Sequence, residues 1–228
     1  MARYLILAAS SDIGQGLYHK LQAQGHELIT TARQAGFDHQ LDLCDFAAVN
    51  ALFASIGPVD GVVNCAGSLL LKPAHLTSYD AYMAVIHASL TSSFAVVAAA
   101  GAHLQHSSIV LISSAAAEIG LANHEAIAAA KAGIIGLARA AAATYANHHL
   151  RFNVIAPGLV QTRLTEGLLN NEMFKKASEA MHPLGRIGKV QDVVNAISFF
   201  LDPENDWITG QVLAVDGGLS SLKPRVKI

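Results

Sequence analysis

Charged residues, cysteines and aromatic residues are all scarce in this chain of 228 residues. Charged side chains make up only 14% of it, the formal net charge is −2, and no block of like charge occurs. Proteins that bind nucleic acids normally carry a basic patch. The composition therefore argues against a nucleic-acid partner and favours chemistry on a small molecule.

Only two cysteines occur, Cys44 and Cys65, and neither lies in a pattern typical of a catalytic thiol or a metal ligand. A chain that is 52% hydrophobic can build one sizeable core without disulfide bonds. We therefore expect a reduced, cytoplasmic setting and no metal site.

Long uninterrupted hydrophobic segments are missing as well. The apolar run at residues 4–9 is too short for the core of a signal peptide and continues directly into Ser10 and Ser11, so we interpret it as a first strand. No stretch approaches the roughly 18 apolar residues of a membrane-spanning helix. We expect no membrane partner.

What is present is a regular alternation of short apolar runs and helical patterns. Helical spacing places Ile13, Leu17 and Leu21 on one stripe, which ends at Gly25. Such alternation predicts an α/β fold, with a doubly wound parallel sheet covered by helices on both faces, in a single domain over residues 1–228. The predicted strands span residues 4–9, 28–31, 59–64, 109–113, 151–156 and 211–215.

A small-residue turn follows the first predicted strand and opens a helix. Backbone amides and the helix dipole at such a turn can hold a diphosphate, although the plain G-x-G-x-x-G pattern is absent. Asp12 can serve as the N-cap of the helix, but a carboxylate near phosphate is unfavourable. A methyl group at Ala8 costs about 1 kcal/mol if the backbone there needs a positive φ. The candidate phosphate-binding residues are Ser10, Ser11, Asp12, Ile13 and Gly14.

A second candidate site begins at the strand that ends in Ser113 and Ser114 and continues into an alanine-rich helix containing Lys131. This arrangement resembles the active site of the short-chain dehydrogenase/reductase family, in which a serine precedes a Tyr-x-x-x-Lys pair by thirteen residues. Thirteen residues after Ser114 the chain has Ile127 in place of the tyrosine. The resemblance implies that Ser114 and Lys131 polarise the substrate, and that Lys131 also holds the nicotinamide ribose.

The resemblance extends over essentially all 228 residues and implies a Rossmann fold that binds a nicotinamide dinucleotide. Arg33 follows Ala32, which stands where relatives specific for NAD carry an acid, and this implies NADP(H) rather than NAD(H). Residues 183–188 and 208–218 match the C-terminal signatures of the family. The further cofactor-binding residues that the resemblance implies are Asp42, Leu43, Asn64, Cys65, Ala66, Gly67, Pro157, Gly158, Val160 and Thr162.

Two of the four catalytic positions of the family are changed. Ile127 cannot donate a proton, and Ser89 stands in place of an asparagine that bends its helix and holds a water. In the enoyl reductase branch the working tyrosine lies seven residues before the lysine, where this chain has His124. Histidine is a common general acid, so His124 or water is the candidate proton donor.

Two functional classes therefore stay open. The first is an NADP(H)-dependent oxidoreductase acting on a small carbonyl or alcohol substrate with an atypical active site. The second is a catalytically inactive relative that binds the nucleotide as a sensor or an assembly subunit. Residues 163–181 resemble the variable substrate lid of the family, and the alanine-rich helix at about residues 126–145 suits a homodimer or homotetramer.

Overall fold

In the computed structural model, which describes residues 1–223, one seven-stranded sheet forms the centre of the protein. All of its strands are parallel, in the order β3-β2-β1-β4-β5-β6-β7. This arrangement confirms the predicted doubly wound, Rossmann-type sheet. The strands are β1 (Arg3–Leu7), β2 (Glu27–Ala32), β3 (His39–Gln40), β4 (Gly61–Asn64), β5 (Ser108–Ile112), β6 (Arg151–Pro157) and β7 (Val212–Val215).

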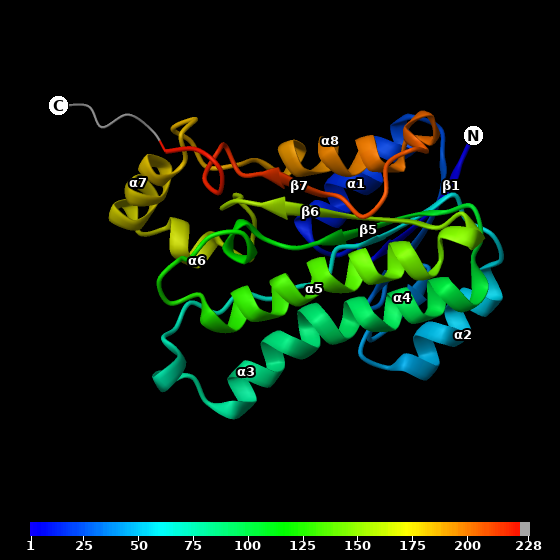
Figure 1. Ribbon diagram of the computed structural model, residues 1–228, viewed down its shortest axis with the longest axis horizontal. Coiled ribbons are helices and arrows are strands. Elements are labelled where there is room, and N and C mark those ends of the chain that lie inside the picture. Colours follow the sequence, from blue (N-terminus) through cyan, green and yellow to red (C-terminus); the bar gives the residue numbers. More distant parts are fainter. Residues whose placement is uncertain (224–228) are drawn as a thin grey trace.

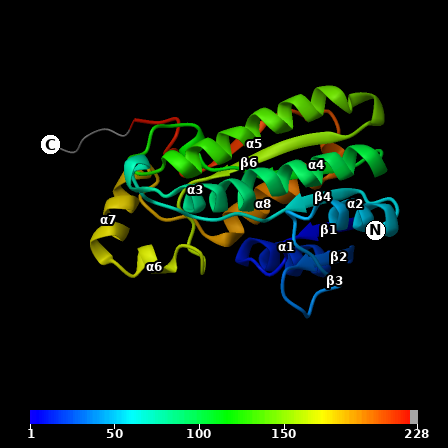
Figure 2. The same cartoon turned by 90° about the horizontal axis from the view of Figure 1, so that it is seen from below.

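Helices cover both faces of this sheet (Figure 1). One face carries α1 (Asp12–Ala23) and α8 (Val190–Leu201). The other carries α2 (Phe46–Ile56), α4 (Ser92–His103) and α5 (Glu125–Thr144), with α3 (Tyr79–Ile86) alongside α5 (Figure 2). Two short helices, α6 (Glu166–Leu169) and α7 (Glu172–Met181), lie beyond the sheet, at the end toward which the arrowheads of β5 and β6 point.

The sheet is flanked by a hydrophobic core on each face. Leu5, Val62 and Phe152 face the core under α2, α4 and α5, whereas Ile6 and Ile155 face the core under α1 and α8. Because neighbouring residues of a strand point to opposite faces, a central strand needs apolar residues at nearly every position. The apolar runs that predict the strands have this character.

All six predicted strands are present, with ends that shift by one or two residues. The prediction omits β3, which has two exposed residues and no apolar run to reveal it. Residues 33–38, which precede β3, form only bends. β2 and β3 are therefore connected without an intervening helix.

Two long helices are strongly apolar. The continuous helix Tyr79–His103 and the helix Glu125–Thr144 are long and apolar enough, by length and composition, to cross a membrane. By mean hydropathy, these two helices come closer to a membrane span than the length of uninterrupted apolar runs indicates. Half of each apolar window is buried within the protein, and α4 and α5 cover one sheet face. Core helices of this kind are weak evidence for a membrane.

The turn between β1 and α1 contains a strained alanine. Ala8 has a φ of 54°, in the left-handed region that favours glycine, and its carbonyl accepts a hydrogen bond from the amide of Ser11. The following helix packs tightly on this turn, because a Cβ added at Gly14 would lie 2.8 Å from the Cα of Ala9. The backbone of the turn is therefore fixed despite the methyl group of Ala8.

Replacing Ala8 by glycine should raise the free energy of unfolding by about 1 kcal/mol, because glycine adopts a positive φ without a steric penalty. Urea denaturation of the wild type and of Ala8→Gly measures this difference. Ala9→Gly is the matched control, since Ala9 is buried and has no positive φ, and we expect it to lower stability. If Ala8→Gly were no more stable than the wild type, the positive φ of Ala8 would not be a source of strain.

Candidate functional site

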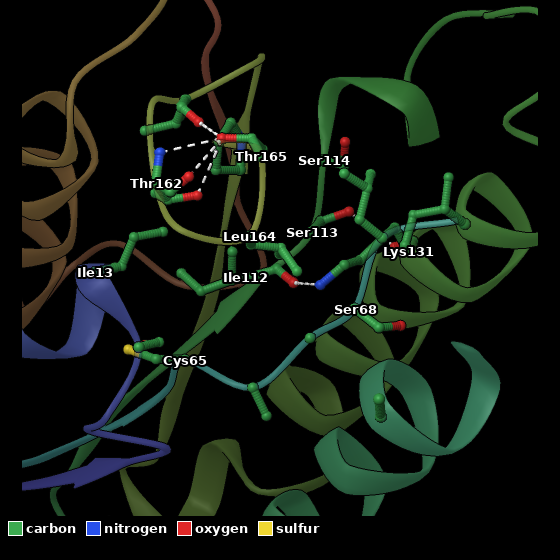
Figure 3. Close-up of a pocket in the computed structure, with 18 of the residues that line it drawn as sticks. Ile13, Cys65, Ser68, Ile112, Ser113, Ser114, Lys131, Thr162, Leu164 and Thr165 are labelled. Carbon is green, nitrogen blue, oxygen red and sulfur yellow. Dashed lines mark hydrogen bonds between the residues drawn. The ribbon is translucent and has the colours of Figure 1, made fainter. Parts of the chain in front are cut away.

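A cavity of about 1070 Å³ lies at the carboxyl ends of the central strands. It is lined by the segments that follow β1, β2, β4, β5 and β6, and by side chains of α5, α6 and α7. The sheet order reverses direction between β1 and β4, and ligands of open α/β sheets bind at such switch points. Figure 3 shows the inner part of this cavity.

The phosphate-binding candidates meet at one end of the cavity. Ser10, Ser11, Asp12 and Ile13 line it, whereas Gly14 lies behind them against the turn. Ser11 is the N-cap of α1, because its hydroxyl accepts a hydrogen bond from the amide of Gly14 at 3.1 Å. Asp12, which the sequence analysis considers as N-cap, is instead the first residue of the helix. Its carboxylate is consequently free to bind another side chain.

Lys131 reaches the cavity from α5 with only 6% of its surface exposed. Its Nζ donates to the carbonyl of Ile112, at the end of β5, at 2.8 Å (Figure 3). Burial lowers the pKa of Lys131 to about 8, since the charged amine loses its hydration. Near neutral pH the amine therefore keeps its proton, although much less firmly than a lysine in water.

The hydroxyl of Ser113 fixes the helix that carries this lysine. Its Oγ donates to the backbone carbonyl of Lys131 at 2.8 Å, in a buried contact between the end of β5 and α5. Sequence reasoning assigns no role to Ser113, although the paired serines place it next to Ser114. We interpret Ser113 as a positioning residue.

Ser114 and His124 both line the cavity. The Oγ of Ser114 accepts a hydrogen bond from the amide of Ala116 at 3.2 Å, which leaves its own proton available to a ligand. The Nδ1 of His124 lies 2.7 Å from the carbonyl of Ala122, a distance at which Nδ1 acts as the donor. Nε2 is then the nitrogen of His124 that can exchange a proton with a ligand.

Ile127 forms an apolar wall one helical turn before Lys131. Only 3% of its surface is exposed, and it packs in a cluster with Val85, Ala126 and Ala130 while lining the cavity. The position at which the family resemblance predicts a tyrosine is thus occupied by a packed aliphatic side chain.

The helical segment between β4 and β5 contains a π-helical turn over His87–Thr91, which includes Ser89. Such turns are frequent at functional sites. Ser89 is fully buried, does not line the cavity, and its Oγ has no hydrogen-bond partner among residues 1–223. Its carbonyl accepts hydrogen bonds from the hydroxyls of Ser92 and Ser93. The π-helical turn therefore forms with a serine at this position.

The remaining predicted residues divide into two groups. Asn64 does not line the cavity, because its side-chain amide donates to Ser93 and its oxygen accepts from the amide of Ala66. Arg33 is exposed at the rim. The other predicted residues that line the cavity are Asp42, Leu43, Cys65, Ala66, Gly67, Pro157, Gly158, Val160 and Thr162.

Three further side chains at the cavity are given no individual role by the sequence analysis. The hydroxyl of Ser68 is buried without a partner among the described residues (Figure 3). His182 is buried between the carbonyl of Ser178 and the amide of Leu159. Arg163 forms an ion pair with Asp12 across 151 residues of sequence. Only the tertiary structure brings these partners together.

The arrangement fits a nicotinamide dinucleotide. Amides at the start of α1 and the cations Arg33, Arg163 and Lys131 face one cavity, and their chemistry suits phosphates and a ribose. The backbone also leaves room for the lysine, because a Cβ added at Gly67 would come within 3.2 Å of the Nζ of Lys131. The cavity is as large as the largest typical ligand sites, at about 1,000 Å³.

Comparisons with known proteins agree with this geometry. A family model described as enoyl-(acyl carrier protein) reductase matches residues 7–220. The 3-oxoacyl-[acyl-carrier-protein] reductase MabA of Mycobacterium tuberculosis is 31% identical over 229 residues, which cover 94% of this chain and 91% of that protein.

Solved structures show the same fold. The ligand-free aldohexose dehydrogenase of Thermoplasma acidophilum superposes with a TM-score of 0.90 at 27% identity, covering 100% of this chain and 97% of that one. A small-chain dehydrogenase in complex with NADPH superposes with a TM-score of 0.86 at 25% identity, covering 96% and 98%. With a matching family model over nearly its whole length and relatives of this similarity, the chain belongs to the short-chain dehydrogenase/reductase family of oxidoreductases.

Proposed function

We propose that this protein is an NADP(H)-dependent oxidoreductase that interconverts a small carbonyl compound and its alcohol. The observation that carries the proposal is the buried amine of Lys131, held at 2.8 Å from the carbonyl of Ile112 beside the cavity. Burying a lysine is costly, and a buried titratable group that lines a cavity is a candidate for a role in binding or catalysis. Ser114, whose proton is free, supplies the second polar group at the substrate carbonyl.

When bound, the dinucleotide supplies or accepts the hydride. Lys131 holds the ribose and places a positive charge near the substrate oxygen, on which negative charge develops during reduction. Ser114 donates a hydrogen bond to that oxygen. Because Ile127 has no proton to give, the proton comes either from water or from the Nε2 of His124. Absence of a positioned acid costs about 10²–10⁴ in rate, so we expect weak turnover.

The apolar side chains of the predicted substrate lid favour an apolar substrate. Leu164, Leu168, Phe174 and Met181 line the cavity from residues 163–181. The name of MabA refers to a 3-oxoacyl group, so acyl thioesters belong in a substrate panel beside simpler ketones. A cytoplasmic location stays a prediction.

A homodimer or homotetramer also stays a prediction. An exposed stripe of small residues on α5, which includes Ala129, Gly136 and Ala140, supports such an oligomer, and sedimentation velocity would measure the oligomeric state.

We expect NADPH to bind with micromolar affinity and more tightly than NADH. The exposed guanidinium of Arg33 at the rim of the cavity can pair with the 2′-phosphate that only NADPH carries. In calorimetric titration, Arg33→Ala should reduce NADPH affinity by about tenfold or more and leave NADH affinity unchanged. Arg139→Ala, which removes an exposed arginine outside the cavity, is the control. If the wild type bound neither dinucleotide, the proposed function would be wrong.

Ile127→Tyr should raise kcat/KM on a carbonyl panel by about 10²–10⁴, because it restores a phenol one helical turn before Lys131. Ile127→Phe introduces the same ring without the hydroxyl and should bring no such gain. His124→Ala, tested in the wild-type background, decides between the two proton donors: unchanged turnover assigns the proton to water. Dinucleotide binding without turnover in either the wild type or Ile127→Tyr would favour the inactive relative.

The stability of the protein should rise between about pH 8 and pH 10.5 because of Lys131. Burial lowers its pKa from 10.5 in the unfolded chain to about 8, so in this window the unfolded state holds a proton that the folded state has released. The effect is at most about 3 kcal/mol, at about 1.4 kcal/mol for each pKa unit. Urea denaturation across this pH range measures it. Lys131→Met should lack the rise and Lys176→Met, at an exposed lysine, should retain it; parallel curves for all three proteins would refute a buried amine.

A further inference from the structure

The segment that begins the lid is bonded to the turn after β1 through a single arginine. The backbone amide of Arg163 donates to Oδ2 of Asp12 at 2.6 Å, and its Nε donates to Oδ1 at 2.5 Å. Its Nη2 donates to the carbonyl of Ser10 at 2.6 Å. Asp12 therefore has both carboxylate oxygens bound by one residue of the lid segment.

Without a cationic partner, the negative charge of Asp12 would repel a diphosphate bound at the turn after β1. Asp12 is the first residue of α1, where a carboxylate suits the helix dipole but repels any other anion at the same place. Its side chain is largely buried, at 23% exposed, so water screens the charge only in part. A guanidinium in direct contact cancels that charge.

Arg163 also keeps hydrogen-bonding capacity for a ligand. A guanidinium has five N–H groups, and two of them are used in the contacts with Asp12 and Ser10. Among the described residues, Nη1 of Arg163 has no protein acceptor within hydrogen-bonding distance. The side chain is 65% exposed and lines the same cavity as Ser10, Ser11 and Asp12.

We propose that Arg163 is a cofactor-binding residue that neutralises Asp12 and donates its free N–H groups to the diphosphate of the dinucleotide. This proposal rests on the proposed function and adds a residue and a charge balance to it. Asp12 and Arg163 act as a pair: the aspartate orients the guanidinium, and the guanidinium removes the repulsion that the aspartate alone would exert.

A double-mutant cycle with NADPH as the probe tests the pair. We expect Arg163→Met to weaken NADPH binding by about ten- to a hundredfold in calorimetric titration, because Asp12 is left unpaired beside the diphosphate and a donor is lost. In the Asp12→Gly background, where no carboxylate needs neutralising, the same arginine substitution should cause a loss at least about threefold smaller. Lys176→Met removes the same charge from the exposed side of the lid and should leave the dissociation constant unchanged.

A second probe separates binding from a merely structural effect on the lid. Adenosine 2′-monophosphate has no diphosphate, so its affinity should fall with Arg33→Ala and stay unchanged with Arg163→Met. A change of less than about threefold in NADPH affinity for Arg163→Met, or an equal loss with and without Asp12, overturns the proposal while the proposed function stands. Binding of neither NADPH nor NADH to the wild-type protein overturns both.

Discussion

The constraint on which this structure depends is that all seven strands run parallel. Parallel strands need crossover connections, most of which are helices here, and these helices bury both sheet faces, so the strand ends are left to form a site. The cavity, the phosphate turn, Ser114 and Lys131 all lie at the carboxyl edge. The predicted lid at residues 163–181 follows β6, and that connection also leaves the sheet at this edge.

At this edge, the packing of α5 against β5 changes the chemical properties of Lys131. Its helix crosses the end of β5 closely enough for Ser113 to bond its carbonyl and for Ile112 to accept its amine. These contacts hold the side chain away from water, and desolvation then lowers its pKa to about 8. With Ile127 packed beside it, the cavity holds a buried amine and an aliphatic wall but no phenol at this place.

Much of the fold and part of the site follow from local patterns. Apolar runs with turn residues between them predict six strands, and the family resemblance around Ser114 and Lys131 implies that strand β5 and helix α5 meet at one place. Roles that depend on partners distant in sequence do not follow. Asn64 resembles a cofactor-binding residue in its motif, yet its side chain is bonded to Ser93 and the amide of Ala66 and lies off the cavity.

The sequence by itself determined the parallel α/β architecture, because the spacing of apolar residues is a local property that distinguishes strands from helices. It also determined which chemical groups stand at the predicted catalytic positions, including Ile127 where the family resemblance predicts a tyrosine. Only the tertiary structure decided the electrostatics of the site. The ion pair of Asp12 with Arg163 and the desolvation of Lys131 depend on distances between segments that are far apart in the chain, and no local pattern encodes those distances.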